Sequence, residues 1–358
     1  MTPSNFCSRA FNEISFDVNG TISPCCVING KEYDSVEDYL SSDYLQKIRS
    51  DLLNNIKTPA CKACWLYESI GAWSNRLSES FTEDNLIKNC HLKFSNKCNF
   101  KCRMCSAKLS SAIGVENNIK NPITSTFSNK DIKKYFYTKL LPQLKLINIS
   151  GGEPFLSDDH LEFLKVAHLI NPTVHLSYNS NMSTISYKGV DFRSFWEYYR
   201  SVTITASIDG YEKSQEYQRF GSSWEKIESN MLELRDYVQD IHCCVSIYTI
   251  YHLPDLINWC IKHNFVLKFY AVGQKWLQID TLPSNLKQDI LARFKSLSPN
   301  TEDLAKQIVS LLKSLQNNPG NLKTYNLQFK KNTENLDRLR NQSFVEINPQ
   351  FKDWYERI

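Results

Sequence analysis

Residues 98–105 read CNFKCRMC, so Cys98, Cys102 and Cys105 stand at spacings of four and three. They follow a short apolar stretch, HLKF at 91–94, that is typical of a strand. Three close thiols suit disulfides, a zinc ion or an iron–sulfur cluster. Zinc would prefer a fourth ligand nearby, and neither flanking stretch, FSNK or SAKLSSAIG, offers a cysteine or histidine. The spacing therefore favours a [4Fe–4S] cluster with one iron left open.

The composition argues against several classes of protein. Among 358 residues there are 42 basic and 38 acidic side chains, and this small excess of positive charge does not indicate nucleic-acid binding. No run of 18 apolar residues exists, so we expect no membrane span, and the opening MTPSNFCSRA lacks the layout of a signal peptide. We expect a cytoplasmic protein, where thiols stay reduced. The 12 cysteines are then metal ligands or buried apolar residues rather than disulfides.

Strand and helix patterns alternate through the middle of the chain. Amphipathic segments such as DDHLEFLKVAHLI separate short apolar stretches, which predicts a parallel sheet with helical crossovers, an α/β fold. Residues 106–128 are predicted to be a loop. Six units are too few for a closed eight-stranded barrel. The predicted strands lie at 91–94, 144–150, 174–179, 202–208, 243–250 and 266–272.

The two ends of the chain have other patterns. EISFDVNG ends in Asn19-Gly20, a hairpin signal, and TISPCCV reads as the return strand. Residues 34–53 carry apolar side chains at helical spacing and predict one helix. After residue 283 the strands stop, and Thr301 can cap a helix with an apolar stripe. We expect a helical C-terminal extension packed on the barrel.

CNFKCRMC resembles the C-x3-C-x2-C signature of the radical S-adenosylmethionine (radical SAM) superfamily. SGGEP at 150–154 follows the second strand, as the family's GGEP motif does. The resemblance implies a partial (β/α)6 TIM-like barrel over residues 83–282. It also implies that the backbone of Gly151, Gly152, Glu153 and Pro154 pairs with the amino group of the cofactor's methionine moiety.

Further positions fall in the family's order. Asn181 matches a residue that reaches the ribose, although Met182 replaces the family's glycine. SIDG at 207–210 resembles a Ser-x-Asp-Gly strand end, which adds Ser207 and Asp209 to the expected cofactor site. Arg219 matches an arginine that meets the methionine carboxylate, and Met104 holds the position that touches adenine partly through its backbone. By themselves, an Asp-Gly pair is commonly a turn and a lone arginine is commonly solvated.

A second group of cysteines lies near the N-terminus. A hairpin, a helix and CKAC at 61–64 are similar to the SPASM/twitch auxiliary domain of radical SAM enzymes, here placed at residues 1–82 before the barrel. The resemblance implies a second [4Fe–4S] cluster on Cys7, Cys25, Cys61 and Cys64, with Cys26 as the alternative to Cys25. A zinc-ribbon-like site fits the spacing equally well. The cysteines in strand or helix patterns are expected to be core thiols: Cys90, Cys243, Cys244 and Cys260.

The resemblance implies an enzyme with two [4Fe–4S] clusters and S-adenosylmethionine. The open iron would chelate the cofactor, and one electron would cleave it to methionine and a 5′-deoxyadenosyl radical that abstracts a hydrogen atom from the substrate. The substrate is expected to be a peptide or small molecule, and the electron donor a flavodoxin or ferredoxin. The sequence identifies no catalytic hydrogen donor or base. The alternative is a non-catalytic zinc or iron–sulfur protein with a structural or partner-binding role. Residues 283–358 form the expected C-terminal helical extension.

Overall fold

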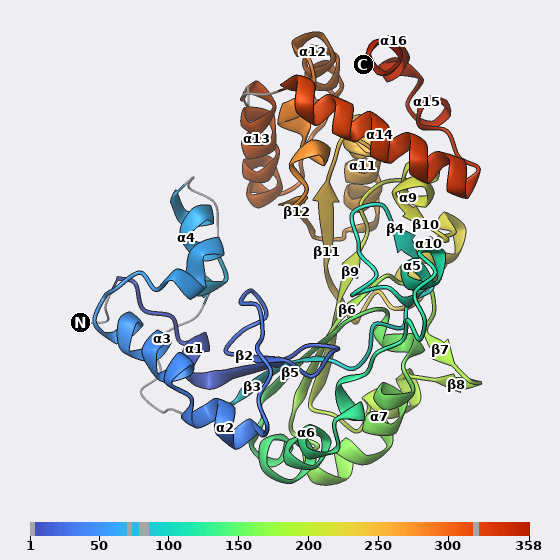
Figure 1. Cartoon of the computed structure of the whole chain (residues 1–358). Helices are drawn as coiled ribbons and strands as arrows, with labels where there is room; N and C mark the ends of the chain where they lie inside the picture. Colours follow the sequence, from blue (N-terminus) through green and yellow to red (C-terminus); the bar gives the residue numbers. More distant parts are fainter. Residues whose placement is uncertain (1–3, 70–73, 79–85, 318–321) are drawn as a thin grey trace. The chain divides into compact units, whose positions relative to one another are not determined.

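The computed structural model describes residues 4–69, 74–78, 86–317 and 322–358. The chain divides into two compact units that alternate along the sequence (Figure 1). The first unit comprises Met1–Cys98, Ala107–Asn179 and Ile185–Thr203, and the second comprises Asn99–Ser106, Ser180–Thr184 and Ile204–Ile358. The cysteine loop therefore enters the second unit directly after Cys98.

The first unit is built on five strands that hydrogen-bond in the order β2-β1-β3-β5-β6. They are β1 (Glu13–Phe16), β2 (Ile22–Ser23), β3 (Asn89–Lys93), β5 (Leu146–Ser150) and β6 (His175–Ser180). β1 and β2 are antiparallel and the other pairs are parallel. Gly20 has φ +78°, a conformation that suits glycine, so the expected hairpin is present. Its return strand is shorter than predicted, because the chain turns at residues 24–28.

Serine caps explain how the helices of the first unit differ from the prediction. The single helix expected at 34–53 is two helices, because Ser42 accepts a hydrogen bond from the Leu45 amide and starts a new one. The predicted loop at 106–128 contains a short helix capped by Ser110. The helices are α1 (Arg9–Asn12), α2 (Val36–Ser41), α3 (Asp43–Leu53), α4 (Lys62–Ser69), α5 (Ser111–Glu116), α6 (Lys130–Tyr135), α7 (Asp158–Ile170) and α8 (Arg193–Trp196). A small hairpin joins β7 (Ser186–Tyr187) and β8 (Val190–Asp191).

The second unit contains parallel strands in the order β9-β11-β12 and a separate antiparallel pair, β4 with β10. Their bounds are β4 (Lys101–Cys102), β9 (Ser201–Ser207), β10 (Arg219–Phe220), β11 (Val238–Val245) and β12 (Leu267–Ala271). β11 ends earlier than the strand predicted at 243–250. Residues 246–249 form a buried turn whose apolar side chains extend the strand-like pattern.

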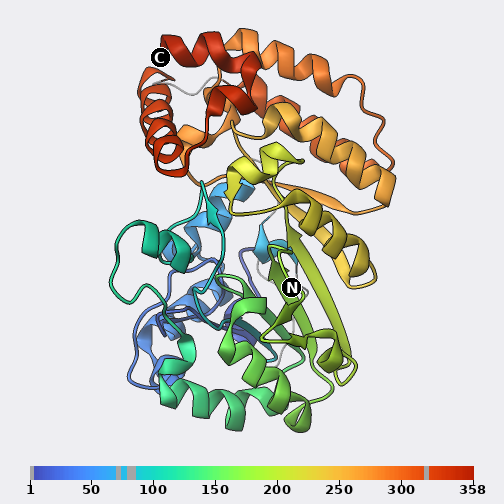
Figure 2. The ribbon, with the colours of Figure 1, turned by 90° about the vertical axis from the view of Figure 1, so that its right-hand side faces the viewer.

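The helices of the second unit include the expected C-terminal extension, whose helices gather together in both views (Figures 1 and 2). Thr301 caps α13 as predicted. An aromatic core that includes Phe329, Phe344 and Trp354 holds the last helices together. The helices are α9 (Lys213–Gln218), α10 (Trp224–Glu233), α11 (Leu253–His263), α12 (Ser284–Phe294), α13 (Glu302–Gln316), α14 (Leu322–Arg340), α15 (Phe344–Ile347) and α16 (Lys352–Arg357).

The α/β fold class predicted from the sequence is confirmed. The six barrel strands β3, β5, β6, β9, β11 and β12 alternate with helices, and within each unit their pairs are parallel. The boundaries at residues 82 and 282 stay predictions. None of the helices in the described parts of the chain is long and apolar enough to cross a membrane.

Candidate active site

The three motif cysteines lie on one loop that follows β3. The backbone amide of Cys98 donates to Ser111 Oγ at 3.2 Å in the first unit. In the second unit, Cys102 ends β4 opposite Arg219 of β10, and the Cys105 amide donates to the Cys102 carbonyl at 3.0 Å. All three side chains are partly accessible, and burial raises the pKa of Cys105. The loop thus presents three thiols after the first barrel strand, as the sequence predicts.

The SGGEP turn is locked to the segment that leads into the cysteine loop. The amide of Gly152 donates to Ser95 O at 2.9 Å, and that of Glu153 donates to Lys97 O at 2.7 Å. A Cβ at residue 151 would stand 2.5 Å from Ser95 O, and one at residue 152 would stand 2.2 Å from Lys97 O. Glycine is therefore required at both positions. The buried carboxylate of Glu153 accepts a hydrogen bond from the Phe155 amide and caps the turn that begins at Pro154.

Asn181 lies in a polar group with residues of the cysteine loop. Its Nδ2 donates to Asn99 Oδ1 at 3.1 Å, and Asn99 Nδ2 donates to Ser183 Oγ at 3.0 Å. Met182 adopts φ +58°, the left-handed conformation that the family's glycine would favour. Asn230 of α10 donates to the Met182 carbonyl at 2.7 Å. The local backbone therefore keeps a glycine-like turn despite the substitution.

Arg219 is fixed beside a motif cysteine. Its Nε donates to Asp209 Oδ2 at 2.6 Å, and its Nη1 lies 4.0 Å from Cys102 Sγ. Burial opposes the positive charge, but Asp209 and Cys102 raise the pKa of Arg219, so the guanidinium stays charged. The other oxygen of Asp209 accepts a hydrogen bond from the Cys244 amide at 2.8 Å. Both oxygens of Asp209 are thus engaged, and this carboxylate orients Arg219.

The remaining predicted cofactor residues lie at the same end of the second unit's strands. Ser207 ends β9, two residues before Asp209. The Met104 carbonyl accepts a hydrogen bond from Gln274 Nε2 at 2.7 Å. Neither Asn99 nor Gln274 is among the residues predicted for the site. Asn99 lies inside the quoted motif, but Gln274 is 170 residues from Met104 and no local pattern marks it.

The N-terminal cysteines are more deeply buried than those of the motif. Cys7, Cys25, Cys61 and Cys64 have exposed fractions of 7–9%, whereas Cys26 is half-buried and accepts a contact from Asn75 Nδ2 at 3.8 Å. Burial raises the pKa of Cys7 to about 11. Burial, with the neighbouring Cys7 and Cys64, raises the pKa of Cys61 to about 12. Cys7, Cys61 and Cys64 therefore lie within electrostatic range of one another. Cys25 interacts with Cys26 and Glu13.

Arg76 clamps the region around these thiols. Its guanidinium binds both oxygens of Glu68 at 2.5 and 2.9 Å, and its Nη1 donates to Phe6 O, next to Cys7, at 3.0 Å. Its charge opposes the rise in the pKa of Cys61. A cation at this point favours the thiolate form that binds metals.

The thiols suit iron–sulfur clusters in type and in position along the chain. Across the described ranges, no three Cys, His, Asp or Glu side chains converge closely enough to hold a metal ion. The raised pKa values of Cys7 and Cys61 mean that these two thiols are protonated in the metal-free chain, so metal binding there would release protons. Three thiols on one loop, with Arg219 beside one of them, suit an open-iron cluster. Four buried thiols with Arg76 nearby suit a fully ligated one.

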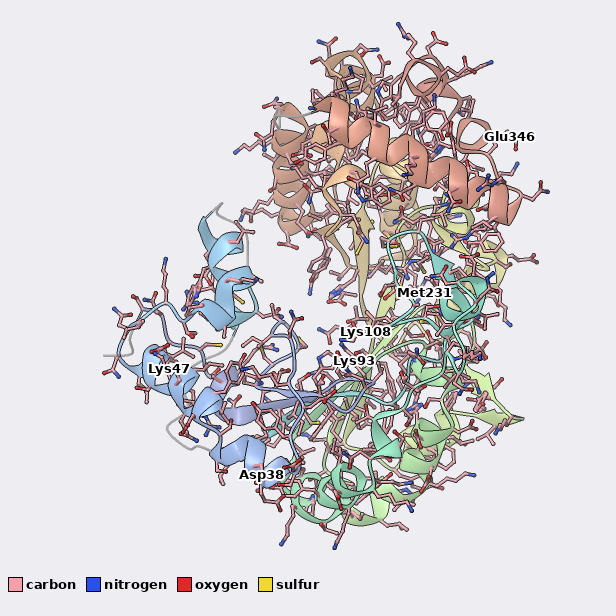
Figure 3. The ribbon with its side chains drawn as sticks, in the orientation of Figure 1. Asp38, Lys47, Lys93, Lys108, Met231 and Glu346 are labelled. Carbon is pink, nitrogen blue, oxygen red and sulfur yellow. The ribbon has the colours of Figure 1, made fainter. Side chains whose placement is uncertain are left out.

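Charged side chains also gather near the end of β3. Lys93 and Lys108 both pair with Asp17, at 3.2 and 2.7 Å, and Figure 3 shows the two lysines close together. His91, two residues before Lys93, is buried, and its Nε2 lies 2.6 Å from Ser150 Oγ. Burial, with Lys93 and Arg9, lowers the pKa of His91 to about 3, so this imidazole is neutral. The side chains of His91 and Lys93 give β3 a polar face.

A model of the Radical SAM superfamily matches residues 92–256, from β3 into α11. The match includes the cysteine loop, the SGGEP turn and Arg219. Residues 92–256 therefore form a radical SAM domain. The match supports the superfamily and the enzyme class predicted from the sequence, and a radical SAM domain implies a [4Fe–4S] cluster and S-adenosylmethionine as cofactors.

No curated protein matches the chain. Among solved structures, it is similar to Streptococcus suis SuiB bound to the precursor peptide SuiA. That comparison gives 13% identity and a TM-score of 0.37 over 67% of this chain and 61% of that one. It is also similar to SuiB bound to S-adenosylmethionine, with 12% identity and a TM-score of 0.36 over 79% of this chain and 66% of that one. The chain thus spans less than two thirds of either SuiB chain.

Proposed function

We propose that this radical SAM enzyme reductively cleaves S-adenosylmethionine and abstracts a hydrogen atom from a peptide or small-molecule substrate. The placement of Arg219 carries the proposal, because Asp209 holds this buried cation with Nη1 4.0 Å from Cys102 Sγ. A fixed guanidinium beside a cluster ligand suits the carboxylate of the methionine moiety. When bound, a reduced [4Fe–4S] cluster supplies the electron that breaks the sulfonium bond and yields the 5′-deoxyadenosyl radical.

The chain's own residues bind and orient the cofactor in this proposal. Cys98, Cys102 and Cys105 provide the three thiolates. The backbone of the SGGEP turn binds the methionine amino group, and its rigidity supports this role because both glycines are held against Ser95 and Lys97. Asn181 binds the ribose. Met104 contacts adenine through its backbone, which Gln274 holds in place.

An auxiliary [4Fe–4S] cluster on Cys7, Cys25, Cys61 and Cys64, in a twitch-like domain, is part of the proposal. Four thiolates saturate such a cluster, so it would transfer electrons rather than bind substrate. The buried thiols and the clamp of Arg76 on Glu68 and Phe6 support this role. A flavodoxin or ferredoxin would deliver the electron that starts each cycle.

Iron content tests the two-cluster proposal. Anaerobic reconstitution should give about eight irons per chain, four in each cluster. Replacing Cys98, Cys102 and Cys105 by Ala should leave about four, held by the N-terminal thiols. A colourless protein that binds zinc would instead support the non-catalytic alternative. Loss of all iron from the triple variant would contradict the proposal that the two clusters bind at independent sites.

Cofactor cleavage tests the reaction. Dithionite-reduced enzyme should convert S-adenosylmethionine slowly to 5′-deoxyadenosine and methionine without substrate. Arg219→Ala should weaken cofactor binding by roughly 10- to 100-fold, because a charge-assisted contact contributes about 1.5–3 kcal/mol. Arg338→Ala, at an exposed position of α14, is the matched control. An unchanged dissociation constant for Arg219→Ala would remove this residue from the site.

A further inference from the structure

The cysteine loop carries a charged side chain that no cofactor role explains. Arg103 lies between Cys102 and Met104, and its side chain is fully buried. Its guanidinium stacks on the Tyr217 ring, 3.6 Å from the centroid, and its Nε donates to the Tyr217 carbonyl at 2.9 Å. The Arg103 amide donates to Gln218 O at 2.8 Å. Side chain and backbone of this one residue therefore fasten the loop to α9.

The charge of Arg103 is balanced by the C-terminal extension. Its Nη2 donates to Asp337 Oδ1 at 2.5 Å and to Gln342 Oε1 at 2.9 Å. Asp337 lies near the end of α14, which reaches the neighbourhood of β4 and α9 (Figure 1). This ion pair joins residues that are 234 positions apart in the sequence.

Asp337 is itself held from two further directions. Tyr217 Oη donates to its Oδ1 at 2.8 Å, and the amide of Phe344, the first residue of α15, donates to its Oδ2 at 2.8 Å. The carboxylate therefore joins the cysteine loop, α9 and α15. Because the guanidinium is buried, removal of Asp337 would leave an uncompensated charge directly beside a cluster ligand.

We infer that Asp337 is a positioning residue of the radical site. Through Arg103 it fixes the backbone that carries Cys102, Met104 and Cys105, and so sets the geometry of both the cluster ligands and the adenine contact. This inference rests on the proposed function of the loop. Asp337 then gives α14 a role in shaping the site, whereas the sequence suggested only a helix packed on the barrel.

The test compares variants of the full-length, anaerobically reconstituted enzyme. Asp337→Asn removes the charge, Gln342→Ala removes one neutral partner of Arg103, and Asp337→Glu restores the charge. Glu334→Gln, one turn earlier on the exposed face of α14, is the control. The measurements are the dissociation constant for S-adenosylmethionine, the change in the cluster's EPR spectrum when the cofactor is added, and the melting temperature.

We expect Asp337→Asn to weaken cofactor binding by at least tenfold and to alter the EPR response. Gln342→Ala should weaken cofactor binding less than Asp337→Asn does. Asp337→Glu should retain part of the wild-type binding, and Glu334→Gln should leave it unchanged. A purely structural role would lower the melting temperature and leave the dissociation constant and EPR response unchanged, and that result would overturn the inference. If Asp337→Asn does not fold, Gln342→Ala decides by the same criteria. Wild-type enzyme without any EPR response to the cofactor would instead contradict the proposed function.

Discussion

A methyl group added at residue 152 would collide with backbone atoms on the segment that leads into the cysteine loop. Its closest contacts would be Lys97 O at 2.2 Å and the carbonyl carbon of Asn96 at 2.6 Å. Backbone atoms cannot move aside as the end of a flexible side chain can. The SGGEP motif can therefore be recognised in the sequence. The reason that it needs glycine is a close approach in the folded chain between two segments that are distant in the sequence.

Gly152→Ala should destabilise the chain by about 1–3 kcal/mol, the usual cost of overpacking, and should also impair cofactor binding. Chemical denaturation and cofactor titration measure the two effects. Gly273→Ala is the matched control, because a Cβ at residue 273 meets nothing within 4 Å. Equal stability of the two variants would show that the Gly152 turn tolerates a side chain.

At the scale of single elements, α3 supports the N-terminal thiols. Leu52 and Ile48 of α3 pack in a buried cluster with Cys7, Phe6 and Phe11. The next residue, Leu53, is 52% exposed. Two adjacent leucines on one helix therefore differ in whether they touch the core that holds Cys7.

Leu52→Ala should cost about 2–5 kcal/mol through the cavity it leaves, and iron should be lost selectively from the N-terminal site. Leu53→Ala should leave stability and iron content close to those of the wild type. Thermal unfolding and iron analysis after gel filtration provide the readouts. If both variants retain all iron, packing of α3 does not support the auxiliary site.

A second element-scale prediction concerns the polar face of β11. Burial alone would raise the pKa of Asp240. Hydrogen bonds from His242, Lys268 and Thr205 instead hold it well below its usual range. A lowered pKa means that the ionised carboxylate stabilises the fold above the unfolded-state pKa, about 3.9, and that this contribution is lost as the pH falls further.

Asp240→Asn should therefore be less stable than the wild type by about 2 kcal/mol at pH 7, and the difference should shrink below about pH 4. Urea denaturation over a pH series checks this. Asp289→Asn, at an exposed site on α12, should show little difference at any pH. A difference for Asp240→Asn that stays constant with pH would contradict the ionised, hydrogen-bonded carboxylate.

At the scale of the whole molecule, the ligand thiols of the two proposed clusters differ in how far they are shielded from solvent. Cys98, Cys102 and Cys105 are only partly buried and supply three ligands, whereas the four N-terminal thiols are at most 9% exposed. Slow exposure to oxygen should therefore remove iron in two stages, from about eight per chain to about four, with the radical-site signal lost first. Iron analysis and EPR at successive times follow this order. Earlier loss of the N-terminal signal would contradict it.

Local signals explain which parts of the fold the sequence could predict. The motif, the SGGEP turn and the barrel strands follow from short patterns, and all but one of the barrel strands lie close to their predicted ranges. β11 was predicted at the wrong residues because Ile247 and Tyr248 are buried in a turn and Ile250 is buried at the start of a 3-10 helix. Burial rather than strand pairing produced the apolar pattern. The contacts of Asp209 with Arg219 and of Gln274 with Met104 depend on tertiary structure, so no local pattern contains them.

The link between Arg103 and Asp337 also has a consequence for biosynthesis. A ribosome that adds about 5–20 residues per second needs about 12–47 seconds to travel the 234 residues between these two partners. During that interval the cysteine loop has been synthesised, but its anchor in α14 does not yet exist. Iron delivered to the nascent chain before that point would meet a loop whose shape is not yet set, so the radical-site cluster is best inserted after α14 has been synthesised and has folded.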